Sequence, residues 1–312
     1  AILLGEHFVV HGSPALALPL TGLRLRAGLR PACPGEPRAA GHLGACLEIV
    51  LGALGQDLAA LAVEVDSTIP LGSGMGSSAA LSVALSRAGA EAFGLPPDPG
   101  RDRELSMRCE RLAHGRPSGI DTEVCLTGRA VWAEGGRFTP LTTYAGHGIG
   151  LVVLLVGQGG ATGEMVSRVG EFRAANPARF QALSEATRER CLEARALLEG
   201  GAMSGTGPGT GLGTGPGTGV DASERLERLG RLERLGAILG EQHRALAEIG
   251  VSTPGLDSAV AAACEEGAAG AKLSGAGGGG AVLAIASLEE LPGLAERLAA
   301  RGLGVVTSGP LM

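Results

Sequence analysis

Three segments of the sequence carry residues whose types and spacing could handle a phosphate group. In the first, Gly72, Gly74 and Gly76 alternate with two other residues, and Ser77 and Ser78 follow. Glycines let a backbone approach a ligand closely, and the free N–H groups that open a helix attract an anion. The segment is neither a Walker A motif nor a dinucleotide fingerprint. A tight turn capped by Ser77 is the alternative interpretation.

The second segment holds two carboxylates separated by a turn rich in proline and glycine. Glu110 lies near the end of an expected helix, and Asp121 follows a turn that can return it to the same cleft. A kinase needs one carboxylate for the metal ion of ATP and another for the proton of the attacking hydroxyl. Carboxylates at this spacing are also common on ordinary surfaces.

The third segment, from Lys272 to Gly280, lies between two expected strands. Five of the six residues at 275–280 are glycine. Glycine weakens a plain strand connection because it loses much backbone entropy on folding. We therefore expect this loop to lie against a ligand, since a linker would be polar and exposed.

Hydrophobic patterning predicts the elements that position these segments. A short buried strand at 1–4 runs into Gly5-Glu6-His7, and a half-buried strand at 63–66 leads to the first glycine segment. Helices are expected at 78–93 and 102–113, then a strand at 151–156 and two helices within 164–199. The tail is expected to form a helix at 255–267, strands at 271–274 and 280–286, a helix at 288–301 and a strand at 303–307. This order predicts an α/β or α+β second domain that begins near residues 145–150.

Two repetitive segments interrupt the second half. Residues 204–220 repeat Gly, Thr and Pro, a composition that cannot pack, so we expect a flexible surface insertion there. The string Arg-Leu-Glu-Arg-Leu-Gly occurs twice at 225–236 and predicts a helix to about residue 248 with a solvated face.

The amino-acid composition limits which classes of protein this chain can belong to. A chain of 312 residues favours two domains, and 45% apolar with 19% charged residues indicates a globular protein. Aromatic residues make up only 2%, so the core must consist mainly of Ala, Leu and Val. The formal net charge of −6 argues against a nucleic-acid partner. Lys272 is the single lysine among 26 cationic side chains.

Cysteine usage and hydrophobic run lengths bear on the compartment. The six cysteines show no CxxC and no metal-finger spacing, which predicts buried reduced thiols. No run approaches the length of a membrane span, and the first residues lack the features of a signal peptide. These observations predict a cytoplasmic protein without a membrane partner.

Together and in this order, the three segments resemble the GHMP kinase superfamily, which includes galactokinases, homoserine kinases, mevalonate kinases and phosphomevalonate kinases. The resemblance covers nearly the whole chain. The strings at 5–12 and 114–121 are similar to those of the mevalonate kinases. The resemblance implies an α+β fold of two domains with the site between them. These are a domain like ribosomal protein S5 domain 2 at 1–147 and a ferredoxin-like domain at 148–312.

The resemblance also implies an activity and its residues. The activity is transfer of phosphate from ATP, with Mg²⁺, to the 5-hydroxyl of mevalonate in isoprenoid biosynthesis, in a protein that forms a homodimer. Asp121 matches the catalytic carboxylate, and Ser78 and Glu110 match the Mg²⁺ ligands. The positions that match ATP-binding residues are Gly72, Ser73, Gly74, Met75, Gly76, Ser77, Ser78, Ser274, Gly275, Gly277 and Gly278. Those that match substrate-binding residues are Glu6, His7, His114 and Thr162.

The chain departs from the family's pattern at its first residue. The family places a lysine just before the segment that starts here at Ala1, where it polarises the catalytic carboxylate and the γ-phosphate. Either the sequence is a truncated version of a normal enzyme or the enzyme is a weakened one, and we expect truncation because the chain opens in the middle of a strand. On that view we expect poor turnover without that charge and a rise by orders of magnitude when Gly-Lys is added upstream.

Two classes of alternative stay open. One is another superfamily enzyme, such as a phosphomevalonate kinase, a homoserine kinase or a relative of diphosphomevalonate decarboxylase. The other is a non-catalytic regulator that binds ATP or a metabolite. The absent lysine favours the regulator, whereas Ser78, Glu110 and Asp121 argue against it, because a sensor has little use for a base and metal ligands.

Overall fold

The computed structural model describes residues 1–56, 61–115, 117–142, 148–200 and 222–311. The strands are β1 (Ile2–Leu4), β2 (Ala15–Ala17), β3 (Leu25–Pro31), β4 (Leu61–Ser67), β5 (Val131–Glu134), β6 (Arg137–Pro140), β7 (Ile149–Val156), β8 (Gly270–Ser274), β9 (Gly280–Ser287) and β10 (Gly304–Pro310). The helices are η1 (Val9–His11), α1 (Gly41–Ala53), α2 (Ser77–Ala92), α3 (Pro99–His114), α4 (Ile120–Thr127), α5 (Thr162–Ala175), α6 (Pro177–Glu199), α7 (Ala222–Glu248), α8 (Pro254–Glu265) and α9 (Leu291–Ala300).

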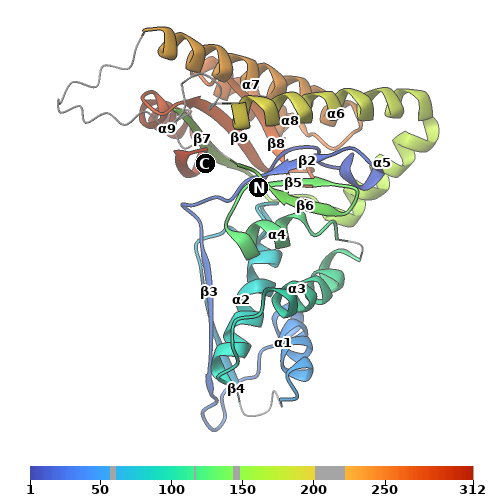
Figure 1. Ribbon diagram of the computed structural model, residues 1–312, viewed down its shortest axis with the longest axis vertical. Coiled ribbons are helices and arrows are strands. Elements are labelled where there is room, and N and C mark those ends of the chain that lie inside the picture. Colours follow the sequence, from blue (N-terminus) through green and yellow to red (C-terminus); the bar gives the residue numbers. More distant parts are fainter. Residues whose placement is uncertain (57–60, 116, 143–147, 201–221, 312) are drawn as a thin grey trace, which may run out of the picture.

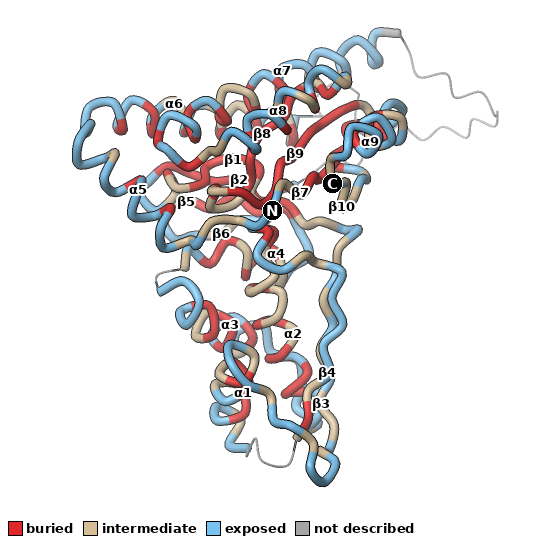
Figure 2. The backbone as a smooth tube through the Cα atoms, turned by 180° about the vertical axis from the view of Figure 1, so that it is seen from behind, coloured by how far each residue is buried: buried red, intermediate tan, exposed pale blue. Residues whose placement is uncertain are grey.

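The broad upper part of the molecule is built on one antiparallel sheet in the order β10-β7-β9-β8 (Figure 1). Numbered along the chain this order is 4-1-3-2, with helices between the first and second strands and between the third and fourth. That is the ferredoxin-like topology expected from the sequence. The strand β9 is buried over nearly its whole length (Figure 2).

The central strands of this sheet are apolar on both faces because both faces are covered. Along β7, Leu151 and Val153 pack into one core, while Val152 and Leu154 pack into another. Successive side chains of a strand point to opposite faces, so a continuous aliphatic run indicates a strand buried on both sides.

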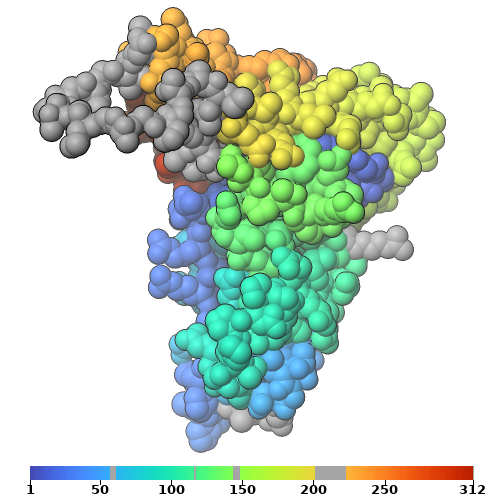
Figure 3. All heavy atoms as spheres, in the orientation of Figure 1, coloured from blue at the N-terminus to red at the C-terminus, as the bar shows by residue number. Residues whose placement is uncertain are grey.

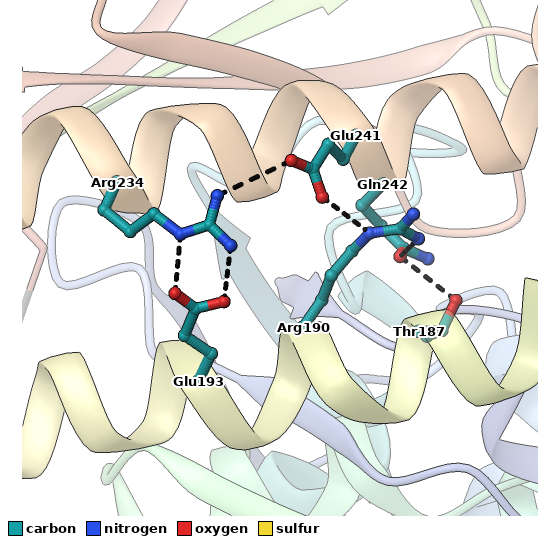
Figure 4. Close-up of polar contacts among 6 residues, drawn as sticks. All are labelled: Thr187, Arg190, Glu193, Arg234, Glu241 and Gln242. Carbon is teal, nitrogen blue, oxygen red and sulfur yellow. Dashed lines mark hydrogen bonds and ion pairs between the residues drawn. The ribbon is translucent and has the colours of Figure 1, made fainter.

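Two long helices, α6 and α7, lie side by side above the sheet and are joined by ion pairs (Figure 4). Arg234 of α7 pairs with Glu193 of α6, and Arg190 of α6 reaches Glu241 of α7 at 3.2 Å. The apolar sides of the helices, including Cys191 and Leu235, are fully buried below. The tandem Arg-Leu-Glu repeats therefore form the solvated helix that their pattern predicts, with some of their leucines in the core.

The lower, narrower part comes from the first half of the chain (Figure 3). The strands β3 and β4 form a two-stranded ribbon, paired from Leu25 with Ser67 to Pro31 with Leu61. The apolar side of this ribbon packs with α1, α2 and α3 in a separate core. A second sheet, in the order β1-β2-β5-β6, lies between this part and the upper sheet (Figure 1).

Local sequence explains where two of the helices begin. The Asp98 side chain accepts hydrogen bonds from the N–H groups of Gly100 and Arg101, and Pro99 occupies the first position of α3. Thr253 caps α8 in the same way, followed by Pro254. A side-chain cap followed by proline satisfies the free N–H groups of the first turn and presets the backbone.

The structure confirms the predicted elements within a few residues at their ends. It adds η1, α1, β2, β3, α4, β5 and β6, for which the sequence analysis made no prediction. The six cysteines are free as predicted, but the prediction that they are buried holds only in part, because Cys33 and Cys264 are exposed and Cys125 is half-buried. The insertion at 204–220 lies outside the described residues. The domain boundary at 147/148 adjoins residues 143–147, which also lie outside them, so that division stays a prediction.

Candidate active site

The first glycine segment leads directly into α2. Gly72, Gly74 and Gly76 have φ values of 66°, 74° and 76°, a left-handed conformation that side chains disfavour. Gly76 is the residue before the helix, and no side chain caps the helix at this end. The first N–H groups of a 16-residue helix are therefore available to an anion.

Two side chains of this segment are buried. Ser73 is fully buried and its hydroxyl donates to the Pro70 carbonyl at 2.7 Å. Met75 packs into the core that also holds Cys191 of α6 and Leu235 of α7. The Ser73 side chain therefore has no free hydroxyl for a nucleotide, whereas Met75 also lines the cavity that reaches Gly76.

The first and third glycine segments touch one another. A Cβ atom added to Gly275 would lie 2.8 Å from the carbonyl oxygen of Gly74, and one on Gly280 would lie 2.7 Å from that of Ser73. Neither distance leaves room for a side chain, so the glycines are required by this close approach. The Ser274 hydroxyl is also engaged, because it donates to the Ile2 carbonyl at 2.9 Å.

A further glycine segment, which the sequence analysis did not identify, joins these two. The N–H of Gly159 donates to the Gly72 carbonyl at 2.9 Å, and the N–H of Gly160 donates to the Gly277 carbonyl at 3.0 Å. Three glycines within four positions, 157–160, follow the aliphatic strand β7, and that spacing is the signal that could have located the segment. Thr162 follows one residue after it, half-buried, as the first residue of α5.

Ser78 and Glu110 meet behind the first segment. The Ser78 hydroxyl donates to Oε1 of Glu110, across from α2 to α3. Glu110 is buried, and burial raises the pKa of its carboxyl above the ordinary value, partly offset by this hydrogen bond. His114 lies one turn along α3, with Nε2 3.7 Å from Oε2 of Glu110, and its side chain is 31% exposed.

Asp121 lies in the first turn of α4, directly against the first segment. A Cβ atom on Gly76 would be 3.5 Å from the carboxyl carbon of Asp121. Gly119 precedes α4 with φ of 79°, and this turn returns the chain from α3 towards α2. A cavity of about 580 Å³ between α2 and β3 reaches both Gly76 and Asp121. Its volume is typical of a site for a small ligand.

Glu6 and His7 bind the third segment from the N-terminal side. Glu6 is buried and forms an ion pair with Lys272 of β8. His7 has φ of 62°, and its Nε2 lies 2.9 Å from the Ala276 carbonyl oxygen. Burial lowers the pKa of the His7 ring, so the ring is neutral near pH 7 and its Nε2–H donates to that oxygen.

The predicted site residues therefore lie together, and His114 lies at the edge of the group. The three glycine segments, Asp121, the Ser78–Glu110 pair and the Glu6–His7 turn are linked by the contacts above. His114 touches the group through Glu110. The Lys272 partner of Glu6 and the residues at 157–160 are the parts that the sequence analysis did not assign.

Two family models match this chain, and each matched range includes residues of the site. The model described as GHMP kinases N terminal domain matches residues 42–129, and GHMP kinases C terminal matches residues 222–303. The chain belongs to the GHMP kinase family. It is accordingly a kinase of small molecules, and its two matched regions include the first glycine segment and the third.

Individual relatives of this GHMP kinase are mevalonate kinases. The mevalonate kinase of Thermococcus gammatolerans is 29% identical over 315 residues, covering 91% of this chain and 86% of that protein. The mevalonate kinase of Pyrococcus horikoshii is 34% identical over 224 residues, covering 72% and 59%. Among solved structures, L. major mevalonate kinase in complex with R-mevalonate has a TM-score of 0.75 and 26% identity, covering 96% of this chain and 89% of that one.

Proposed function

We propose that this chain is a mevalonate kinase, which transfers the γ-phosphate of ATP to the 5-hydroxyl of mevalonate. The observation that carries the proposal is the contact of Asp121 with Gly76. A carboxylate beside the start of a phosphate-binding helix is where a kinase needs the group that receives the hydroxyl proton.

The chain's own residues divide the work as follows. Main-chain N–H groups of 72–78 and of the loop at 275–277 hold the phosphates of ATP, because the free N–H groups at the start of α2 and the glycine backbone can approach an anion closely. The N–H of Gly278 already donates to the Val251 carbonyl at 2.8 Å. Asp121 orients the substrate hydroxyl and accepts its proton as the oxygen attacks the γ-phosphorus. Phosphoryl transfer depends mostly on positioning and on electrostatic stabilisation, so this arrangement supplies the main requirements.

Ser78 and Glu110 are the residues that would hold Mg²⁺. They offer a hydroxyl and a carboxylate oxygen, the donor types that Mg²⁺ prefers. Within the described residues, no group of three or more His, Cys, Asp or Glu side chains is arranged to hold a metal ion. That fits Mg²⁺, which binds through one or two protein ligands and completes its shell with water and phosphate oxygens. When bound, the ion would neutralise charge on the phosphates.

Mevalonate binds at the Glu6–His7 turn and the start of α5, which together we call the substrate end of the site. A neutral His7 ring that donates from Nε2 leaves Nδ1 as an acceptor for a substrate hydroxyl. Thr162 at the N-terminus of α5 suits the carboxylate of mevalonate, because helix N-termini favour anions. His114 has the weakest case, since within the described residues it is placed in the site by its 3.7 Å approach to Glu110.

Release of ADP from MgATP tests the proposal, with mevalonate, phosphomevalonate, homoserine and galactose as candidate acceptors. Among these acceptors we expect turnover with mevalonate alone, poor in the chain as given and higher by orders of magnitude with Gly-Lys added before Ala1. Turnover with another acceptor would leave the fold and change the substrate. Binding of ATP and mevalonate without ADP release in both forms would favour the regulator.

Two further expectations stay predictions, namely the homodimer and the cytoplasmic location. In the part of the chain that the structure describes, no helix has the length and apolar character needed to cross a bilayer.

A further inference from the structure

Lys272 is the single lysine of this chain, which uses arginine at its other Lys and Arg positions. Twenty-five of the 26 Lys and Arg side chains are arginine, including those in the exposed pairs of Arg179 with Glu248 and of Arg234 with Glu193. Arginine serves wherever charge alone is needed. At this one place the chain has a compact ammonium group instead of a planar guanidinium, and the two are not interchangeable at a buried site.

The surroundings of Lys272 suit the compact ammonium group. Its side chain is 0% exposed and that of Glu6 is 1% exposed. Its Nζ donates to Oε1 of Glu6 and to the Leu273 carbonyl oxygen. A larger guanidinium with five N–H groups would have to displace packed atoms and leave donors unpaired. The charge of Lys272 is therefore directed entirely at the Glu6 turn and its own strand.

Three contacts at alternate residues connect the start of the chain to the third glycine segment. Lys272 pairs with Glu6, the Ser274 hydroxyl donates to the Ile2 carbonyl, and the Ala276 carbonyl accepts from His7. His7 has a positive φ, which a non-glycine residue keeps only where its surroundings enforce it. The buried pair lies directly beside this residue and is the one contact of the three that involves opposite charges.

We propose that Lys272 is a positioning residue for phosphoryl transfer, which acts through Glu6 to hold the His7 turn against the glycine segment at 274–280. The inference rests on the proposed function, because it takes His7 as part of the substrate end. Lys272 itself does not touch the reacting atoms. Loss of its charge would release the turn, and a displacement of about 1 Å can lower turnover by about 100-fold.

Lys272→Met and Glu6→Gln, made singly and together, separate positioning from a merely structural role. Each single variant leaves a buried group unpaired, so both should unfold more readily and lose activity. The double variant has no unpaired buried charge, so its stability should recover. Its kcat/KM for mevalonate should stay about 100-fold below wild type. Recovery of stability and activity together would overturn the inference.

A matched control and a conservative variant sharpen the result. Arg179→Met removes the cation of the exposed pair with Glu248 and should leave kcat and KM unchanged. Lys272→Arg keeps the charge but not the shape, and we expect it to remain impaired. Full activity in Lys272→Arg would contradict the requirement for a compact ammonium.

Isotopic labelling tests the pair in the intact protein, even if the Lys272 variants fail to fold. Protein grown with ¹³C-lysine should show one side-chain signal, because the chain has one lysine. We expect that signal to shift in Glu6→Gln and when mevalonate is added. The inference would be overturned by a signal that titrates with a pKa near 10.4, as an exposed lysine does, and that keeps the same chemical shift in Glu6→Gln. Wild-type protein that fails to phosphorylate mevalonate contradicts the proposed function instead.

Discussion

The Ser78 hydroxyl donates a hydrogen bond to the Glu110 carboxylate, joining two residues that are 32 positions apart in the sequence. This contact ties the first turn of α2 to the last turns of α3. It places a carboxylate behind the loop that we assign to the phosphates of ATP. The sequence shows both residues, but only the packing of the two helices shows that they meet.

Replacing Glu110 with Gln should weaken the use of Mg²⁺. The amide keeps the shape and can still accept from Ser78, but it loses the charge that attracts the ion. We expect the Mg²⁺ concentration for half-maximal ADP release to rise at least about tenfold. Glu104→Gln, on an exposed turn of the same helix, is the control and should change nothing. An unchanged Mg²⁺ dependence in Glu110→Gln would remove Glu110 from the metal site.

The same substitution should not lower stability in the absence of Mg²⁺. Burial raises the pKa of Glu110 in the folded protein, so its charged form opposes folding. The contribution of this group to stability is greatest below its unfolded pKa and is lost as pH rises through the folded pKa. Urea unfolding at pH 7.5 should therefore show Glu110→Gln at least as stable as wild type. A large loss would mean that the charge is paired in the folded state.

Gly275→Ala should disrupt the contact between the two phosphate segments. Its φ is 85°, and the added methyl group would meet the Gly74 carbonyl at 2.8 Å. Gly302 has a similar φ of 80° with nothing within 4 Å, so Gly302→Ala isolates the backbone strain of about 1–2 kcal/mol. We expect Gly275→Ala to be less stable than this control in urea unfolding and to raise the KM for ATP. Equal behaviour of the two variants would show that the approach of the loops is unimportant.

The His7 ring should make stability depend on pH. Burial lowers its pKa in the folded protein relative to about 6.5 in the unfolded chain. Its contribution is therefore present above pH 6.5 and is lost as pH falls through the folded pKa. The difference in unfolding free energy between wild type and His7→Gln should shrink from pH 7.5 to pH 5.5. A constant difference would show that the ring does not titrate with folding.

The sequence predicted much of this molecule because its strongest signals are local. The aliphatic run of β7, the glycines at 72–76 and the repeats of α7 each depend on neighbouring residues alone. What it could not predict depends on contacts between distant residues. The pairing of β3 with β4 spans the whole of α1, and the ion pair of Lys272 with Glu6 spans most of the chain.

The candidate site shows the same division. Asp121, Glu110 and Ser78 could be selected from the sequence because kinase chemistry needs those residue types. The sequence did not show that the hydroxyls of Ser73 and Ser274 are bonded to carbonyl groups. Nor did it identify the segment at 157–160, because glycines after a strand are also common in ordinary turns.

The most direct measurement is mevalonate-dependent ADP release by the wild type and by Asp121→Asn, with Asp66→Asn on the exposed strand β4 as the control. Asn keeps the shape of the side chain but cannot accept the hydroxyl proton. We predict turnover with mevalonate, a loss of about 10³-fold in kcat for Asp121→Asn, and no change for the control. Wild-type turnover that survives in Asp121→Asn would contradict the catalytic role that we assign to this carboxylate.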